Sequence, residues 1–258
     1  MPAILPAAPA LRTSPWRGIG IDASAAARGY WGHGAPTKPP HARPPCPHSM
    51  ALSPELAAWR RTRRTELLDR RMAVDAAQRR AWNTQLTDRL LHAFPVRDGL
   101  IVAAYWPFKG EFDPRFALHA WRQRGARSAL PVVVAKATPL QFRLWWPGVR
   151  TSAGVYGLPV PEGVDVVRPD VVLMPPVGFD AQGYRLGYGG GYYDRTLAAL
   201  SPRPVAIGVG FELSRIETIQ PQAHDIAMDF VVTQDGLWRV DAGTMTPATG
   251  PIALARQA

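Results

Sequence analysis

The residue types that could do chemistry are densest between positions 185 and 195. Four glycines, Gly187, Gly189, Gly190 and Gly191, fall within five positions directly before a stretch with helical pattern. Glycine loses more backbone entropy on ordering than any other residue, so this density indicates positive φ angles or a ligand pressed against the backbone. Bare amides aimed from a helix N-terminus form a nest that suits phosphate. The spacing matches neither the P-loop nor the dinucleotide-binding fingerprint, so a glycine-rich turn covered by its own tyrosines is the alternative.

Charged side chains flank this loop. Arg185 and Arg195 add positive charge on either side, and Asp194 could hold the metal ion of a metal–nucleotide pair. A second concentration of charge, the arginine-rich stretch 60–71, has the pattern of a helix. This stretch predicts either contacts with anionic phosphates or a solvated helix face.

The overall composition restricts the classes of partner. The 258 residues carry 30 Lys and Arg against 20 Asp and Glu, and this net charge of +10 favours nucleic acid, acidic lipid, a nucleotide or a polyglutamate chain. The single cysteine, Cys46, can form no internal disulfide, and no stretch resembles the apolar run of about 20 residues that spans a membrane. The sequence therefore predicts a soluble protein of a reducing compartment, which we take to be the cytoplasm.

Residues 1–49 differ from the rest of the chain. They hold ten of the 27 prolines and no sustained apolar period, so they cannot offset the entropy of ordering and are expected to be disordered. Their apolar start has no basic residue before it, which argues against a secretory signal. Met50 opens a run that reads like a protein start. We therefore expect either an over-extended gene start or an extension without a catalytic role.

The elements that must position the charged residues begin at Ser53, an N-cap candidate with Pro54 at the first helical position. A helix to about residue 73, and a second one from a cap at Asp75 to residue 92, predict an N-terminal α-hairpin. Further helices are expected near 115–124 and 191–200. Short apolar runs bounded by turns predict strands at 100–106, 129–135, 140–146, 171–174, 205–209 and 230–233.

This order of elements predicts the fold class and the domain limits. Strands that alternate with helices and are almost continuously apolar indicate an α/β fold with an open, mostly parallel, Rossmann-like sheet and helices on both faces. In such a sheet the ligands bind beyond the carboxyl ends of the strands. We expect one domain over 50–240, preceded by the extension 1–49 and followed by a loose C-terminal tail at 241–258.

Five blocks of the sequence share their residues and their order with one enzyme family. They are the arginine-rich stretch 60–71, Trp-Pro-Phe-Lys-Gly-Glu at 106–111, Tyr-Gly-Leu-Pro-Val-Pro at 156–161, the glycine loop at 185–194 preceded by Gly-Phe-Asp at 178–180, and His-Asp-Ile-Ala-Met-Asp at 224–229. On these blocks the chain resembles the 5-formyltetrahydrofolate cyclo-ligases, also called methenyltetrahydrofolate synthetases. The resemblance covers about 53–238.

The resemblance implies an ATP- and Mg²⁺-dependent ligase. Such an enzyme closes 5-formyltetrahydrofolate, with or without a polyglutamate chain, to 5,10-methenyltetrahydrofolate and releases ADP and phosphate. The formamide oxygen is a poor leaving group, so its phosphorylation would create an iminium-like carbon that N10 can attack, and catalysis would be mostly positioning and charge neutralisation. Neither nucleic acid nor a membrane is implied as a partner, and we expect a monomer.

The resemblance also assigns site residues. Arg185 and Tyr193 are the implied catalytic residues, and Asp194 and Asp225 are the implied carboxylates on the Mg²⁺ side. The implied nucleotide contacts are Arg60, Arg64, Arg185, Leu186, Gly187, Tyr188, Gly189, Gly190, Gly191, Tyr192 and Tyr193. The implied folate contacts are Trp106, Glu111, Tyr156, Tyr188, Gly189, Gly190, Gly191 and Tyr192.

Two departures from the family pattern and two other functions complete the predictions. Arg60 stands where the family commonly has Lys, and Val132 stands where Arg often follows the Leu-Pro pair, so a charge contact on the folate-tail side is absent. The first alternative function is nucleic-acid binding, with the stretch 60–71 following phosphates. The second is a related α/β enzyme that acts on a sugar phosphate or a coenzyme A thioester.

Overall fold

The computed structural model describes residues 52–254. The chain divides into two units, Met1–Met50 and Ala51–Ala258, and all described residues belong to the second. The predicted disorder of residues 1–49 lies outside the described residues. No helix within 52–254 is long and apolar enough to cross a membrane.

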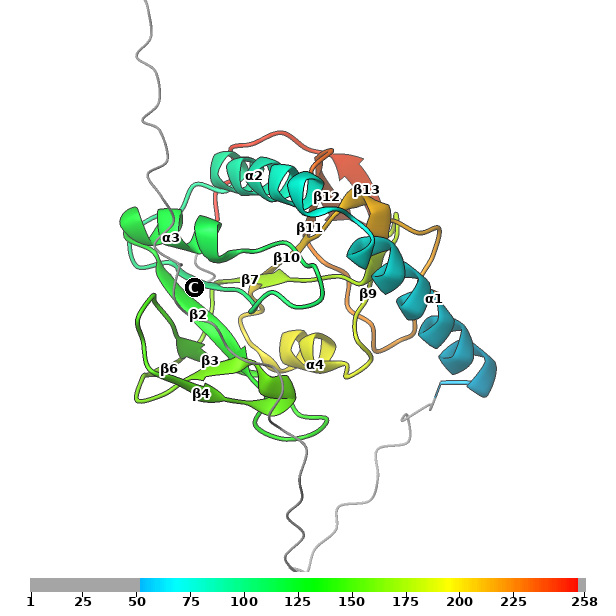
Figure 1. Ribbon diagram of the computed structural model, residues 1–258, viewed down its shortest axis with the longest axis horizontal. Coiled ribbons are helices and arrows are strands. Elements are labelled where there is room, and N and C mark those ends of the chain that lie inside the picture. The colour runs from blue at the N-terminus through cyan, green and yellow to red at the C-terminus, as the bar shows by residue number, and fades with distance from the viewer. Residues whose placement is uncertain (1–51, 255–258) are drawn as a thin grey trace, which may run out of the picture. The chain divides into compact units, whose positions relative to one another are not determined.

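In the described part of the chain, nine strands form one sheet in the order β13-β12-β11-β10-β7-β1-β2-β3-β6 (Figure 1). Their bounds, in that order, are Thr244–Pro247, Leu237–Asp241, Phe230–Val232, Val205–Val209, Val171–Met174, Ile101–Ala103, Arg127–Val132, Gln141–Leu144 and Val166–Val167. Two small antiparallel pairs lie outside this sheet: β4 (Thr151–Ala153) with β5 (Pro159–Pro161), and β8 (Gly178–Phe179) with β9 (Arg185–Leu186).

The strands at the centre of the sheet are parallel, and those at its edges are antiparallel. Parallel pairs join β11, β10, β7, β1 and β2. Antiparallel pairs add β3 and β6 at one edge and β12 and β13 at the other. Successive strands such as β11, β12 and β13 are joined by short links, which permit only antiparallel pairing. The predicted α/β sheet with a parallel centre is confirmed, and the whole sheet is mixed.

Helices cover both faces of this sheet. Their bounds are Pro54–Met72 for α1, Ala76–Ala93 for α2, Arg115–Gln123 for α3 and Tyr192–Ala199 for α4, with 3₁₀ turns η1 (Val155–Gly157) and η2 (Glu212–Ser214). Figure 1 shows α2 and α3 on one side of the sheet and α4 on the other. The helices and strands in the parallel core form close to where the sequence predicts them.

The first two helices begin at the predicted caps. The Ser53 side chain accepts a hydrogen bond from the Leu56 N–H, and the Asp75 side chain accepts two, from Ala77 and Gln78. A short turn joins the helices, but they pack on different partners: α1 contacts η2, whereas α2 contacts α3 and β11. Helix α1 is therefore placed beside the loops that follow the strands.

The prediction of a loose tail at 241–258 is wrong for its described part. Strand β13 pairs with β12, the Ala248 N–H donates to the Leu237 carbonyl, and the Ile252 N–H donates to the Ala93 carbonyl. Leu254 is buried. The strand escapes prediction because it lies at the edge of the sheet, where one face is solvated and proline is tolerated.

The core of the sheet supports the segment that carries the glycines. Met174, Phe179 and Ala206 belong to a buried cluster, and Tyr192 and Tyr193 at the start of α4 pack against it. The glycine loop therefore joins β9 to a helix whose first turn is anchored in the core.

Candidate functional site

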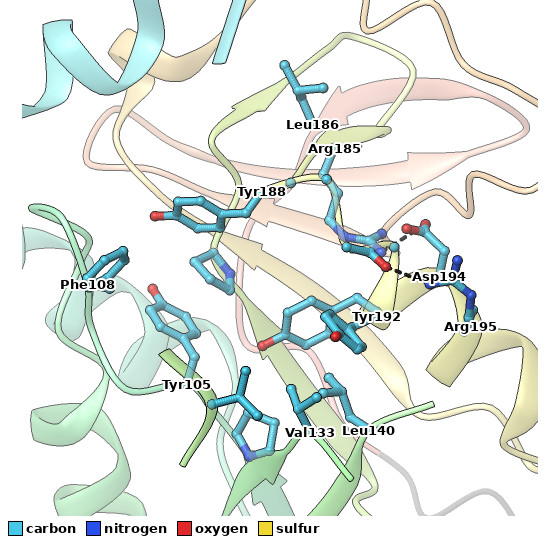
Figure 2. A pocket seen from close by; sticks show the side chains of 18 of the residues that line it. Tyr105, Phe108, Val133, Leu140, Arg185, Leu186, Tyr188, Tyr192, Asp194 and Arg195 are labelled. Carbon is cyan, nitrogen blue, oxygen red and sulfur yellow. Dashed lines mark hydrogen bonds and ion pairs between the residues drawn. The ribbon is translucent and has the colours of Figure 1, made fainter. Parts of the chain in front are cut away.

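A cleft of about 960 Å³ lies beyond the carboxyl ends of the central parallel strands (Figure 2). Trp106 follows β1, Val133 follows β2 and Pro175 follows β7, and all three residues line the cleft. Open α/β sheets bind ligands at this edge, because the loops that leave the strands there converge.

The cleft brings together nearly all of the predicted site residues, although they come from distant parts of the sequence. Those that line it are Arg60, Arg64, Trp106, Glu111, Arg185, Leu186, Gly187, Tyr188, Gly189, Gly190, Gly191, Tyr192, Tyr193, Asp194 and Asp225. The exception is Tyr156, whose side chain is not described, although Val155 and Leu158 beside it line the cleft.

Leu186 differs from the other residues in this set. Its side chain is 1% exposed and belongs to a separate buried cluster with Leu67, Val177 and Ile219. Figure 2 shows this side chain pointing away from the other labelled residues. Leu186 therefore presents its backbone to the cleft, and its side chain fixes β9 to α1.

The glycine loop has the backbone that its composition predicts. Gly189 has a φ of 99° and Gly191 has a φ of 61°, values that residues with a Cβ rarely adopt. Gly187 is different, because a Cβ added there would meet nothing within 4 Å. Gly191 is the N-cap of α4, and no side chain caps this helix. The cap residue itself therefore offers no side-chain acceptor to α4, which suits a helix N-terminus that binds phosphate.

Helix α1 presents arginines to this loop. Arg60 is 5% exposed, and its Nη2 donates to Asp225 Oδ2 at 2.6 Å and to the Gln220 carbonyl at 2.8 Å. One turn later, Arg64 Nε donates to the Gly187 carbonyl at 2.7 Å. Burial, followed by the charge of Arg60, lowers the pKa of Arg64. Two cations this close on one wall of the cleft favour an anionic ligand between them.

A second ion pair lies at the start of α4. Arg185 is 7% exposed, and its Nη2 lies 2.9 Å from Asp194 Oδ1 while Nη1 donates to the Ile226 carbonyl at 2.9 Å. Figure 2 shows Arg185 and Asp194 turned toward each other. The Arg185 guanidinium also lies 5.7 Å from the ring centre of Tyr193. Burial, with a contribution from the charge of Glu111, raises the pKa of the Tyr193 phenol.

The two predicted metal-side carboxylates are neighbours. Asp194 Oδ1 accepts a hydrogen bond from the N–H of Ile226, the residue that follows Asp225. The hydrogen bonds described use Oδ1 of Asp194 and Oδ2 of Asp225, and Asp225 Oδ1 lies 3.9 Å from His224 Nε2. No group of three or more His, Cys, Asp or Glu residues that could hold a metal occurs among residues 52–254. Two carboxylates fit Mg²⁺, which keeps several waters and takes further oxygens from phosphates.

Glu111 is a buried acidic residue that lines the cleft. Its side chain is 3% exposed, its Oε1 accepts from the Tyr188 hydroxyl at 2.6 Å, and its Oε2 accepts from the Phe108 N–H at 2.9 Å. Burial raises the pKa of Glu111, while the hydrogen bond from Tyr188 and the charge of Arg71 oppose that shift. Both oxygens therefore act as acceptors already within the protein.

Trp106 is half-buried where β1 leaves the sheet. Its ring lies 6.1 Å from that of Trp145 in an edge-to-face arrangement, and the Arg115 guanidinium lies 4.6 Å from the Trp106 ring centre. These contacts fix the indole, and its remaining surface faces the cleft. This position is compatible both with packing at a strand end and with contact with a ligand.

Several residues of the site escape prediction from sequence. Tyr105, Phe108, Val133 and Leu140 supply apolar surface to the cleft. Tyr105 and Phe108 flank residues that the sequence does select, so proximity to Trp106 and Glu111 is the signal that could have found them. Val133 and Leu140 carry no such signal, because only the pairing of β2 with β3 brings them to the cleft.

The six arginines of α1 divide between two faces of the helix, and three of them, Arg61, Arg63 and Arg70, are exposed. Arg60 and Arg71 are buried, Arg64 is half-buried, and all three belong to the face of the helix that meets the protein. Tracking of nucleic-acid phosphates calls for clustered, accessible cations along one face. Arg60, Arg64 and Arg71 face the protein and are therefore not available to follow nucleic-acid phosphates, and nucleic-acid binding by the exposed face stays a prediction.

Comparisons with known proteins agree with this architecture. Residues 56–234 match the model of the 5-formyltetrahydrofolate cyclo-ligase family. The chain is 30% identical over 176 residues to the 5-formyltetrahydrofolate cyclo-ligase of Escherichia coli strain K12, covering 66% of this chain and 97% of that protein. It is 33% identical over 181 residues to the enzyme of the same name from Mycolicibacterium smegmatis, covering 66% and 91%.

Solved structures give the same result. The NMR structure of the Aquifex aeolicus 5,10-methenyltetrahydrofolate synthetase superimposes with a TM-score of 0.61 at 26% identity, over 73% of this chain and 96% of that one. The family match extends from α1, which supplies the inward arginines, to the residues just after β11, and so includes every element that lines the cleft. The chain therefore belongs to the 5-formyltetrahydrofolate cyclo-ligase family.

Proposed function

We propose that this protein closes 5-formyltetrahydrofolate to 5,10-methenyltetrahydrofolate at the expense of ATP. Family membership supports the reaction, and one structural observation carries its assignment to this cleft. The glycine loop and the inward arginines of α1 share one cavity with Trp106 and Glu111. A phosphate-binding half and a ring-binding half that open into the same space are what phosphoryl transfer from a nucleotide to a folate requires.

In the proposed reaction the formyl oxygen attacks the γ-phosphorus of ATP, and ADP leaves. The carbon of the resulting phosphorylated formamide is iminium-like, so N10 adds to it through its lone pair. The carbon–oxygen bond then breaks, phosphate departs and N10 loses its proton. The protein supplies no nucleophile for these steps, because both reacting groups belong to the substrates. Its contribution is positioning and neutralisation of charge.

The arginines and the glycine loop would hold the triphosphate. Arg60 and Arg64 supply two cations from one face of α1, and the open space above Gly187 lets a phosphate approach the backbone. Arg185 is the first residue of β9 and lies beside Asp194 and Tyr193, where it would stabilise charge that develops on the transferred group. Tyr193 would shape the wall next to that charge.

Asp194 and Asp225 would hold Mg²⁺ through the oxygens that do not face Arg185 and Arg60. When bound, the ion neutralises phosphate charge and orients the terminal group. The two arginine–aspartate pairs keep these carboxylates on the cleft wall.

The folate ring would lie against Trp106, Tyr188 and Glu111. An indole or phenol can cover the face of a pterin, and a carboxylate can accept hydrogen bonds from its aminopyrimidinone edge. Glu111 already accepts two hydrogen bonds, so its remaining lone pairs would serve the substrate. Tyr156 would add a contact from η1.

The cell compartment and the oligomeric state are part of the same proposal. We place the enzyme in the cytoplasm, as a monomer that acts in one-carbon metabolism. The single cysteine of the chain, which cannot form an internal disulfide, supports a reducing compartment.

The test is an assay of the purified full-length protein with ATP, MgCl₂ and 5-formyltetrahydrofolate. We expect the methenyl product to appear by its near-ultraviolet absorbance, together with equimolar ADP. Omission of ATP, or addition of EDTA in excess over Mg²⁺, should each stop the reaction. A protein that stays inert across a full range of folate and metal concentrations would refute the proposed function.

A further inference from the structure

Arg71 is a buried cation close to the cleft that does not line it. It is 3% exposed and lies on the same face of α1 as Arg60 and Arg64, about two turns beyond Arg64 and about three beyond Arg60. Arg60 and Arg64 reach the cleft, whereas Arg71 lies behind its wall. A buried guanidinium is costly unless its donors are satisfied, so its partners indicate what it does.

The guanidinium of Arg71 joins three segments that form the cleft. Its Nε donates to the Lys109 carbonyl at 3.0 Å, its Nη1 donates to the Pro176 carbonyl at 3.3 Å, and its Nη2 donates to the Tyr188 hydroxyl at 2.7 Å. These partners belong to the turn after β1, the segment after β7 and the glycine loop. Only a planar fork with donors on several sides can reach all three at once, and a lysine ammonium cannot.

One of these segments holds an unfavourable backbone. Lys109 has a φ of 46°, in the left-handed region that a residue with a Cβ seldom occupies, and Gly110 follows with a φ of 71°. Such a conformation persists only where the surroundings hold it. The hydrogen bond from Arg71 to the Lys109 carbonyl stabilises this turn, together with those from the Phe108 N–H to the Glu111 side chain and from the Glu111 N–H to the Phe108 carbonyl.

The same side chain also fixes the direction of a proton. The Tyr188 hydroxyl is an acceptor for Arg71, because a guanidinium can only donate. The hydroxyl hydrogen must therefore point at Glu111 Oε1, 2.6 Å away. Arg71 Nη2 itself lies 3.7 Å from Glu111 Oε1. Arg71 donates to the Tyr188 hydroxyl, and that hydroxyl donates to Glu111 Oε1. With the hydrogen bond from the Phe108 N–H to Oε2, both oxygens of Glu111 are therefore acceptors.

We propose that Arg71 is a positioning residue for the folate half of the cleft. Through hydrogen bonds it fixes the orientation of the Tyr188 hydroxyl and, through it, of the Glu111 carboxylate, without touching the substrate. This inference rests on the proposed function only for the identity of the ligand. The phosphate half has its own arginines, Arg60 and Arg64, so loss of Arg71 should act on the folate and leave the nucleotide largely unaffected.

The experiment compares Arg71→Met with Arg70→Met, which removes an exposed arginine from the adjacent position of the same helix. Binding of 5-formyltetrahydrofolate without ATP is measured by titration calorimetry, and the KM for ATP is measured at saturating folate. Arg71→Met should raise the folate Kd by about tenfold or more, as expected when a buried charge-assisted hydrogen bond is lost. The KM for ATP should change by less than about twofold, since separate sites act independently. Arg70→Met should change neither value.

Two further variants keep the inference testable if Arg71→Met does not fold. Tyr188→Phe removes only the hydroxyl and should also raise the folate Kd, and in that background Arg71→Met should have a smaller effect than it has in the wild type. Arg71→Lys should not restore binding. Wild-type affinity for folate in Tyr188→Phe or in Arg71→Lys would overturn the inference, as would an equal loss of ATP and folate affinity. A wild-type protein that binds no folate would instead refute the proposed function.

Discussion

At the scale of single residues, the cleft is built from charges that are paired before any ligand arrives. Asp225 accepts from Arg60, Asp194 pairs with Arg185, and the Tyr188 hydroxyl bridges from Arg71 to Glu111. Pairing lets these groups remain buried as ions, and it holds their remaining donors and acceptors toward the cavity. The glycine loop and the arginine-rich stretch 60–71 stand out in the sequence because each is a local concentration of one residue type, whereas the roles of Arg60 and Arg64 within it are implied only by the family resemblance.

The partners of those residues are not predictable in the same way. Tyr188 and Glu111 are both selected from sequence, but their hydrogen bond to each other joins residues that are 77 positions apart. Arg71 appears in the sequence as one arginine among six in the stretch 60–71. Only the tertiary structure shows which of them face inward.

Among these paired charges the Asp194 side chain is the most exposed to solvent. Asp194→Asn keeps the size and the hydrogen bond from Ile226 but removes the charge that pairs with Arg185 and would hold Mg²⁺. We expect turnover to fall by about 100-fold or more, the range found when one electrostatic element of a phosphoryl-transfer site is removed. Product absorbance measures the rate, and the unfolding temperature reports the fold.

Asp88 offers a matched control for this substitution, because it is an exposed aspartate on α2. Asp88→Asn should leave turnover unchanged. Turnover of Asp194→Asn at the wild-type rate would contradict the role of this carboxylate.

Glu111 predicts a pH dependence of stability. Burial raises its pKa above the ordinary value of 4.5, so the folded state binds this proton more tightly than the unfolded state does. The free energy of unfolding should therefore fall as the pH rises from 4.5 through the raised pKa. Glu111→Gln removes this titration. Urea unfolding at several pH values should show the wild type losing stability relative to Glu111→Gln over that interval, and a parallel pair of curves would contradict the shift.

At the scale of elements, the glycines of the glycine loop serve two different purposes. Gly189 and Gly191 need positive φ angles, and Gly187 leaves room in the cleft. The sequence predicts both uses together, because either explains a cluster of glycines, and the structure assigns each to particular positions.

Substitution at Gly187 tests the second use. Gly187→Ala should leave the unfolding temperature unchanged, since its Cβ meets nothing within 4 Å. The methyl group would occupy space that a phosphate needs, so the KM for ATP should rise by roughly tenfold. Steady-state kinetics with ATP varied at saturating folate measure this value. A rise in the folate KM alone would place the nucleotide elsewhere.

At the scale of the whole molecule, the two ends of the chain are predicted to differ. We propose that residues 1–49 are dispensable for the reaction, so their deletion should leave turnover and the unfolding temperature unchanged. Deletion of residues 242–258 should destabilise the protein, because it removes β13 and exposes the surroundings of Leu254. Burial of one leucine side chain alone contributes about 2 kcal/mol. Thermal unfolding of both deletions tests the contrast, and a large loss of activity without residues 1–49 would contradict it.

The topology at this scale was predictable in its centre and not at its edges. The strands of the parallel core are short apolar runs buried on both faces, as with Val171–Met174 and Val205–Val209, which begin and end where the sequence predicts. Strand β13 has exposed residues on most of its positions, so it lacks the apolar pattern by which a strand is recognised.

Arg60 and Arg64 of helix α1 lie far before their hydrogen-bond partners in the chain, which affects how the protein is made. Arg64 donates to the Gly187 carbonyl, which lies 123 residues later in the sequence. Arg60 donates to Asp225, which lies 165 residues later. During synthesis this helix leaves the ribosome long before its partners exist, with its inward cations solvated. A nascent chain that stops short of Ile226 therefore lacks part of the cleft lining, and substrates can stabilise the fold only after that residue has been synthesised.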